Sequence, residues 1–209
     1  MRFHQYIRLI LFFIIPFYFF TERFVPSVNA QRKDLSKRIS LGIEIGNWQP
    51  HSLNDEPRFT SFGAAGATPF WGLNCNFPIK WEMGFHFSAG YWSLKDLGKI
   101  ENVHSLVLHP VMIDFKHWLI PDSRFSAYVI YGAGIYWGVE NETTPFGTKL
   151  RQARAGWGIN LGAGFDFLIV GCWGTGMNFY YHYVTFQKPL GGVDDFSGPK
   201  ITAVFFFLL

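Results

Sequence analysis

Apolar residues alternate with small or polar residues along most of the chain. The clearest run covers 157–167, where odd positions are Trp, Ile, Leu, Ala or Phe and even positions are Gly, Asn or Asp. A period of two residues is typical of a β-strand with two unlike faces. The same alternation predicts strands over 39–46, 81–92, 125–140 and 173–184, and less regular runs predict strands over 70–77, 105–120 and 200–209. Within 105–120, Pro110 predicts a bulge or a strand start. The pattern therefore predicts eight strands.

The connections between these strands alternate in length. Long connections of about 47–69, 94–104, 141–152 and 186–198 are separated by short ones of about 78–80, 121–124 and 169–171. Outer-membrane barrels have short periplasmic turns at one rim and longer extracellular loops at the other. The alternation of loop lengths is therefore typical of a transmembrane barrel.

The two faces of the predicted strands differ in side-chain composition, and this difference indicates which face points to lipid and which to the lumen. One face is rich in Phe, Trp and Tyr, and the other is mostly Gly with few of the Lys, Thr and Glu residues that water-facing strands carry. We therefore assign the bulky face to lipid and the sparse face to the lumen. The predicted fold is all-β, a closed antiparallel eight-stranded up-and-down transmembrane barrel, because strands in hydrocarbon must pair on both edges. The alternative is a secreted, soluble barrel of the lipocalin type.

The first thirty residues read as a secretory signal peptide. Arg2 and Arg8 precede an apolar run over 9–20, and Ala30 offers a small residue at a cleavage point. The alternative is an uncleaved anchor, although twelve apolar residues with a proline are short for a membrane-spanning helix. We therefore predict a cleaved signal peptide over 1–30 and a barrel domain over 31–209. The cleavage point has no cysteine, which argues against a lipoprotein.

Composition and charge narrow the class of partner. Hydrophobic residues make up 49% of the chain and charged residues only 16%, below the roughly 25% of soluble domains. The formal net charge is +3, but the predicted signal peptide holds three of the 18 basic residues and one of the 15 acidic ones, which leaves about +1. This removes the electrostatic case for binding nucleic acid. Export would permit a disulfide between Cys75 and Cys172, but two free thiols are the simpler interpretation.

Two stretches carry a resemblance to a known family. "YVIYGAGIYWG" (128–138) and "WGINLGAGFDFLIVGCWGTGMNFYY" (157–181), together with "HPVMIDFKHWL" (109–119), resemble strands of the eight-stranded outer-membrane barrels, in particular the OmpW-like and general outer-membrane β-barrel group. The resemblance implies location in the outer membrane, contact with its lipids, and folding by the barrel-assembly machinery. It also implies the binding or passage of small, apolar molecules. One departure is the end of the chain, "FFFLL", where such barrels often end in an aromatic residue.

The sparse face collects the candidate functional residues. Assigned to the lumen, it brings together Glu44, Glu82, His86, Asp114, Lys116, Asp166, His182 and Lys200. Since eight-stranded barrels have interiors that side chains can fill, one interpretation is an internal network in which Lys116 and Lys200 pair with the carboxylates. The other is a polar conduit or binding site for which the lumen glycines leave space. His86, His182 and a carboxylate lack the short spacing typical of a metal site, and we expect no metal or cofactor.

Three functions remain open. The first is a barrel that binds or passes small molecules, and the second is a structural or adhesin-like barrel with a filled, inert lumen and interacting loops. The third is a lipid-modifying enzyme. It has the weakest basis, because the "HSL" pairs at 51–53 and 104–106 put His and Ser on opposite faces and no serine follows His182 at the right spacing. We therefore expect a protein that is not an enzyme. The sequence leaves its oligomeric state open.

Overall fold

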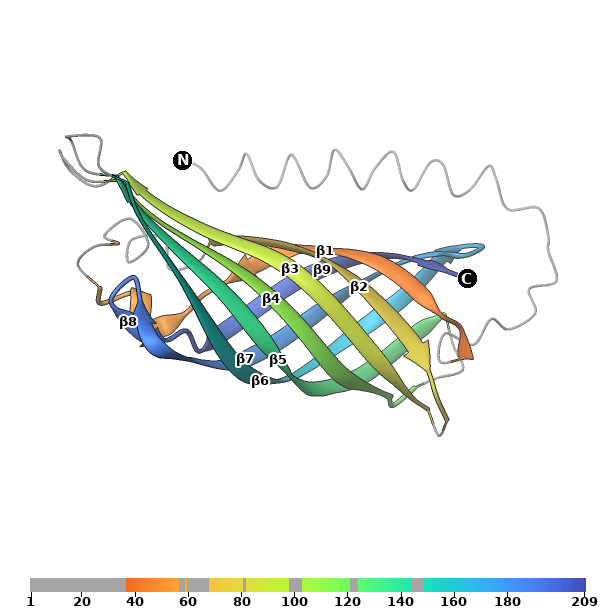
Figure 1. The fold of residues 1–209 in the computed structure, drawn as a ribbon. Coiled ribbons are helices and arrows are strands. Elements are labelled where there is room, and N and C mark those ends of the chain that lie inside the picture. The colour runs from red at the N-terminus through yellow and green to blue at the C-terminus, as the bar shows by residue number, and fades with distance from the viewer. Residues whose placement is uncertain are drawn as a thin grey trace. The chain divides into compact units, whose positions relative to one another are not determined.

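The computed structural model describes residues 37–56, 59, 68–80, 82–97, 103–120, 124–143 and 149–209. These form nine strands and one short 3-10 helix (Figure 1). Their bounds are β1 Ser40–Trp48, η2 His51–Leu53, β2 Thr68–Pro78, β3 Met83–Leu97, β4 Val103–Trp118, β5 Phe125–Thr143, β6 Lys149–Val170, β7 Trp173–Leu190, β8 Val193–Asp195 and β9 Gly198–Leu208. The predicted signal peptide over 1–30 lies outside the described residues.

Eight of the strands close into a barrel. Each strand from β1 to β7 is antiparallel to the next, β7 pairs with β9, and β9 pairs with β1 from Ser40↔Leu208 to Trp48↔Lys200. The ninth strand, β8, pairs only with the end of β7. The predicted closed, antiparallel, eight-stranded barrel is thus confirmed. We call the end with the connections 79–82, 119–124 and 171–172 the turn end, and the opposite one the loop end.

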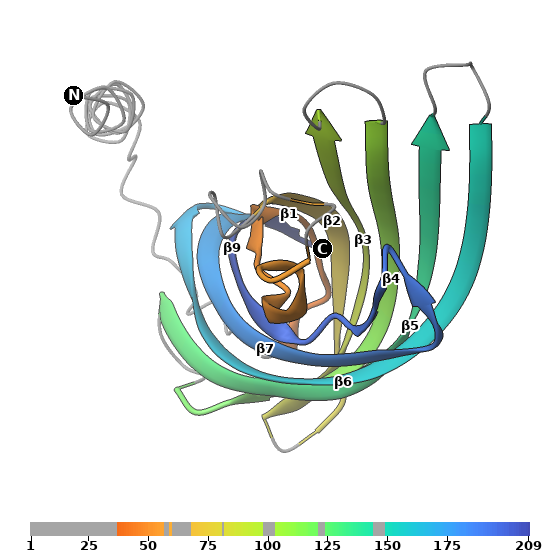
Figure 2. The same ribbon diagram turned by 90° about the vertical axis from the view of Figure 1, so that its left-hand side faces the viewer.

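The strands differ greatly in length. β1 has 9 residues, whereas β5 has 19 and β6 has 22. A strand crosses a bilayer with about 9–11 residues, so β1 just spans it and β5 and β6 continue well beyond. Figure 2, which looks onto the loop end, shows β3 to β6 running past the ring of the other strands.

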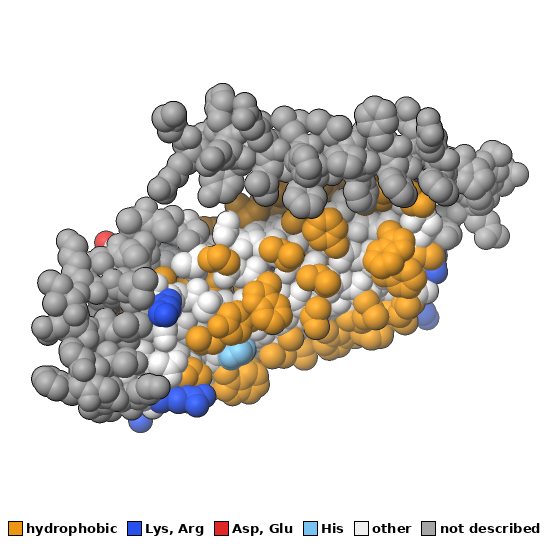
Figure 3. All heavy atoms as spheres, turned by 90° about the horizontal axis from the view of Figure 1, so that it is seen from above, with side chains coloured by type: hydrophobic (Ala, Val, Ile, Leu, Met, Phe, Trp, Pro, Cys, Tyr) orange, Lys and Arg blue, Asp and Glu red, His pale blue; other side chains and the backbone are white. Residues whose placement is uncertain are grey.

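An apolar belt covers the outer wall of the barrel. Large apolar side chains are exposed on every barrel strand, and Figure 3 shows them gathered along the wall, with Lys and Arg near its ends. Exposed aromatic residues mark two levels, for example Trp157 and Phe167 on β6. Their separation of ten positions corresponds to about 33 Å of strand. At a tilt of about 40° this gives about 25 Å, the height of the apolar band of outer-membrane barrels. The outer wall is therefore a membrane-spanning surface.

Pro110 neither starts a strand nor makes a bulge, contrary to expectation. It lies inside β4, and the register of β4 with β3 is the same before and after it, although no pairs are formed at His109 and Pro110. Pairing with β5 continues through Pro110↔Tyr136. Because proline lacks an N–H group, only the ladder on the β3 side is interrupted.

Among the described residues, no helix has the length and apolar character needed to cross a membrane. Cys75 and Cys172 are not joined by a disulfide.

Candidate functional site

Seven of the eight candidate residues point into the barrel. Glu44, His86, Asp114, Lys116, Asp166, His182 and Lys200 are all buried, and they come from β1, β3, β4, β6, β7 and β9. Together with buried Ser, Thr and Asn side chains they form what we call the polar layer, whose other members are Ser40, Asn74, Asn76, Ser126, Asn160, Asn178 and Thr202.

Glu82 is the exception, and its assignment to the lumen was wrong. β3 begins at Met83, so Glu82 belongs to the turn before it, where its side chain is exposed. Its φ of 60° is the left-handed conformation that turns adopt. The alternation of 81–92 extends into this turn by chance, because sequence periodicity does not mark where a strand begins.

One ion pair joins β4 to β6. Lys116 Nζ lies 2.6 Å from Asp166 Oδ2, and both side chains are at most 10 % exposed. The Tyr128 hydroxyl lies 3.1 Å from Asp166 Oδ1 and 2.5 Å from Asn178 Oδ1. The ammonium also sits 3.6 Å from the centre of the Tyr128 ring. Both carboxylate oxygens of Asp166 are therefore bonded to side chains of the barrel interior.

A second charged group surrounds Glu44 on β1. Lys200 Nζ lies 3.6 Å from Glu44 Oε2, and His86 Nε2 lies 3.6 Å from Oε1. Asn74 Nδ2 donates to the same Oε1 over 3.0 Å. Lys200 is further held between the rings of Phe70 and Tyr180, at 4.2 and 4.6 Å from their centres. The lysine–carboxylate pairs expected from the sequence are thus present, and they tie strands together across the lumen.

His182 belongs to the same layer but bonds differently. Its Nδ1 and the Tyr136 hydroxyl are joined by a hydrogen bond of 2.7 Å, and its ring lies 5.5 Å from that of Trp48. Asp114 lies beside His86 and Gly132 in the strand register, and Asn160 is the next residue along that row. Within the described residues no group of three His, Cys, Asp or Glu side chains is arranged to hold a metal.

Above the polar layer, the loop end is closed by an apolar cluster. Leu53 of η2, Phe59, Leu190 and Phe196 are all 0 % exposed. They pack with inward side chains of the barrel, namely Trp48, Phe70, Trp92, Leu94, Leu106, Leu108, Met112, Tyr136, Val184 and Phe186. Figure 2 shows η2 within the ring of strands at this end, with the β7–β8 hairpin across the mouth. We call this the loop-end cluster.

Backbone bonds hold these segments in place. His51 N donates to Ser197 O over 2.9 Å, and Phe196 N donates to Val184 O over 2.9 Å. The tight turn after β7 uses Gly191 and Gly192, both with positive φ. Gly191 N also donates to Glu140 Oε2 over 2.9 Å. Parts of two connections expected to be extracellular loops, namely 51–56 with Phe59 and 190–197, therefore fold back into the barrel mouth.

The lumen glycines do not leave space for a ligand along the wall, contrary to one interpretation of the sequence. A Cβ at Gly162 would lie 2.7 Å from Tyr180 Cδ1, and one at Gly84 would lie 2.9 Å from Trp118 Cη2. These two glycines instead make room for large inward side chains from neighbouring strands. At the turn end, Trp118, Tyr128, Ile130 and Tyr180 pack together, and a second group contains Leu168, Val204, Phe206 and Leu208.

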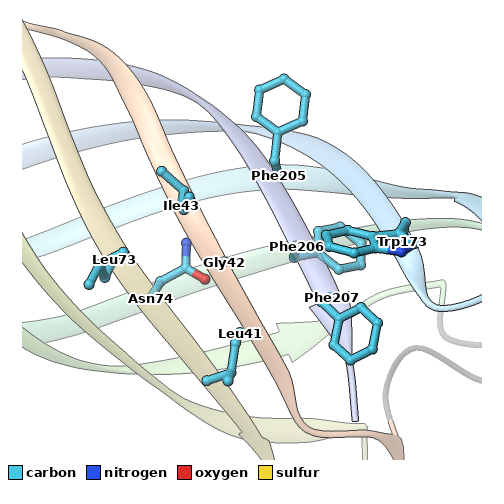
Figure 4. Close-up of a pocket in the computed structure, with 9 residues that line it drawn as sticks. All are labelled: Leu41, Gly42, Ile43, Leu73, Asn74, Trp173, Phe205, Phe206 and Phe207. Carbon is cyan, nitrogen blue, oxygen red and sulfur yellow. The ribbon is translucent and has the colours of Figure 1, made fainter. Parts of the chain in front are cut away.

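An apolar hollow lies in the barrel wall, and its lining includes the inward-facing Asn74 and Phe206 as well as exposed outer residues. It has a volume of about 360 Å³ and is lined by side chains of β1, β2, β7 and β9. Figure 4 shows Leu41, Ile43 and Leu73 on one side of it and Trp173, Phe205 and Phe207 on the other. Its lining suits an apolar group such as an acyl chain.

Searches against protein-family models and curated protein sequences find no match. Solved structures do match. Neisserial surface protein A (NspA) has a TM-score of 0.54 at 11% identity over 82% of this chain and 96% of that one. The outer membrane protein OprG from Pseudomonas aeruginosa has a TM-score of 0.54 at 11% identity over 83% and 96%. The N-terminal β-barrel domain of Pseudomonas aeruginosa OprF has a TM-score of 0.50 at 10% identity over 83% and 98%. At these identities the likeness establishes the shared barrel fold.

Proposed function

We propose that this eight-stranded outer-membrane barrel acts at the cell surface, through the strands that project beyond its loop end, and that its lumen is a structural core. The observation that carries this proposal is the loop-end cluster. Leu53, Leu190 and Phe196 are fully buried in the barrel mouth, which argues against an open path for solutes.

The interior below the cluster supports the same conclusion. Its two lysines are paired with Asp166 and Glu44, and glycines such as Gly162 and Gly84 face large aromatic groups. A buried lysine that is held by a carboxylate is not free to bind a passing molecule. Of the two leading interpretations of the sequence, the geometry therefore favours the surface-interaction barrel over the conduit.

The unequal strand lengths support the assignment of function to the surface. β5 has 19 residues and β6 has 22, which is about twice the 9–11 residues that a strand needs to cross the bilayer. Ordered strands at this height are exposed to the outside of the cell, where a partner can reach them.

The test shortens this projecting part and leaves the barrel intact. Glu140 and Gln152 are register partners, so 141–151 can be replaced by an Asn-Gly turn, which suits a two-residue hairpin. In proteoliposomes, both the natural and the shortened protein should retain small entrapped sugars. When fluorescent proteoliposomes are added to cells, only the natural protein should attach. Sugar release by the natural protein, or equal attachment of both, would overturn the proposal.

One observation favours a second candidate, the binding of a small apolar molecule. The hollow beside Phe205 and Phe207 is mostly apolar, and Leu41, Ile43 and Phe205 of its lining are exposed on the outer wall. A fatty acid carrying a photoreactive group should then label β1 and β9 saturably, with competition from the unlabelled acid. Labelling that rises in proportion to concentration would mean ordinary lipid contact.

In this proposal the chain is not an enzyme, and its constant partners are the lipids of the outer membrane and the assembly machinery. His51 is exposed beside the Tyr181 ring, and His109 faces outward. If the chain is not a lipid-modifying enzyme, its overexpression should leave the mass of lipid A unchanged. A new lipid A species would support the enzyme alternative.

A further inference from the structure

Beyond the membrane, β3 to β6 continue as a hydrogen-bonded sheet. β5 and β6 stay in register from Trp137↔Ala155 to Thr143↔Lys149, and β4 and β5 stay paired up to Val103↔Thr143. We call the part formed by 93–97, 103–107, 138–143 and 149–156 the rim sheet, which rises at the top of Figure 2.

The rim sheet has an open edge along β6. β6 pairs with β7 only from Gly156↔Phe186 onward. Beyond that point β7 turns into the β7–β8 hairpin, with Leu190 paired to Val193. Residues 149–155 therefore pair with β5 on one side and with no described strand on the other. Such an edge presents unpaired N–H and C=O groups to any extended chain that reaches it.

The base of the rim sheet is fixed. Leu94 and Leu106 point inward and belong to the loop-end cluster. The bond from Gly191 N to Glu140 Oε2 links β5 to the β7–β8 hairpin. A pre-ordered edge loses less conformational freedom when a partner binds.

The open edge is basic. Residues 149–156 contain Lys149, Arg151 and Arg154 and no acidic residue. Arg151 is exposed. Arg154 donates from Nη1 to Ala153 O over 3.1 Å and from Nη2 to Gln152 Oε1 over 2.7 Å, so its guanidinium lies along the strand. On the neighbouring strand, Glu140 is turned away into its bond with Gly191.

We propose that 149–155 of β6 binds an extended, acidic segment of a partner protein, which adds as a new strand to the rim sheet. Main-chain bonds would supply affinity, and carboxylates beside Arg151 and Arg154 would supply selectivity. The proposal rests on the proposed function and names its partner class.

A second copy of the chain is the less suitable occupant. Two barrels in one membrane point the same way, so their β6 edges would meet in parallel. Arg151 of each copy would then lie close to Arg151 of the other, and like charges facing across a strand pair are destabilising.

Arg151 and Arg154 lie on opposite faces of β6, because they are three residues apart on one strand. The test therefore uses a short fluorescent peptide of Glu-Glu-Thr-Thr repeats, which carries Glu on both faces, and the full barrel domain in lipid nanodiscs, with binding followed by anisotropy. The double substitution R151E/R154E should weaken binding about tenfold or more, as expected for two lost charge pairs. K95E, at an exposed lysine of β3 in the same rim sheet, should change binding by less than about twofold. The same peptide N-methylated at alternate residues should not bind, because it cannot form the ladder.

Several results would overturn the proposal. Equal binding of the N-methylated peptide would reduce the effect to charge alone, and equal binding to the R151E/R154E protein would place the site elsewhere. Dimers that form through β6 would assign the edge to a second copy. Gel mobility of unheated samples reports whether each variant is folded, and amide shifts of 149–155 in the natural protein locate the peptide if a variant does not fold. Cell attachment that is lost on shortening the rim but kept in R151E/R154E would refute this inference alone and leave the proposed function standing.

Discussion

Replacing Asp166 by Ala removes the partner of a buried cation. Lys116 Nζ lies 2.6 Å from Asp166 Oδ2, and its side chain is 4 % exposed. Removing one member of a buried ion pair costs about 3–5 kcal/mol, because the other charge remains without compensation. Part of this is offset, since Lys116 keeps its position over the Tyr128 ring, at 3.6 Å, and such contacts contribute about 0.5–2 kcal/mol. We therefore expect a net loss of about 1–4 kcal/mol.

The assay is reversible urea unfolding in lipid vesicles, followed by tryptophan fluorescence. Asp194→Ala, at an exposed carboxylate of the loop end, is the control and should stay within about 0.5 kcal/mol of the natural protein. The double variant D166A/K116M should recover most of the loss, because no charge is then buried alone. A loss below about 1 kcal/mol for Asp166→Ala, or a double variant no better than the single one, would mean that water reaches Lys116 and that the layer is open.

Three further predictions concern the wall, the glycines and the thiols. Ala163→Arg places a charge on the exposed outer face of β6 and should reduce folding stability in bilayers by about 2–4 kcal/mol. Ala163→Leu is the control and should cause no such loss. If the two variants were equally stable, the assignment of the outer face to lipid would be wrong. Gly90→Leu would drive the new side chain into the Phe70 ring and should lower the free energy of unfolding by about 1–3 kcal/mol through overpacking. An unchanged free energy of unfolding in the same urea assay would mean that space is free beside Phe70. Cys75 and Cys172 form no disulfide, so a reducing agent should leave gel mobility and the unfolding midpoint unchanged, and a shift in either would contradict the assigned thiol state.

The barrel could be predicted because its strands are two-faced throughout the membrane. Lipid on one side and a packed interior on the other impose alternation, and the eight barrel strands, β1 to β7 and β9, show it over most of the length that crosses the bilayer. The predicted strand over 157–167 extends in the structure to Lys149–Val170. Its first part, "KLRQARAG", lies outside the membrane, where neither face needs to be uniformly apolar. The rim sheet was therefore not predictable from periodicity.

The closure of the lumen escaped prediction for a different reason. Leu53, Phe59 and Phe196 are single apolar residues in long connections, and nothing local distinguishes them from loop residues in contact with solvent. The glycines were misjudged because their space is filled from other strands. Which side chain faces which glycine depends on register, as in the contact of Gly162 with Tyr180, and a single sequence does not specify it. The pairing of lysines with carboxylates was predictable because buried charges require partners.

The central claim is that the lumen is closed, and single-channel recording in planar bilayers tests it most directly. The purified natural protein should give no stepwise current at any voltage at which a porin, added as a positive control, conducts steadily. Reproducible current steps from the natural protein, at protein densities confirmed by folded-state gel mobility, would contradict closure by Leu53, Leu190 and Phe196 and return the barrel to the class of conduits.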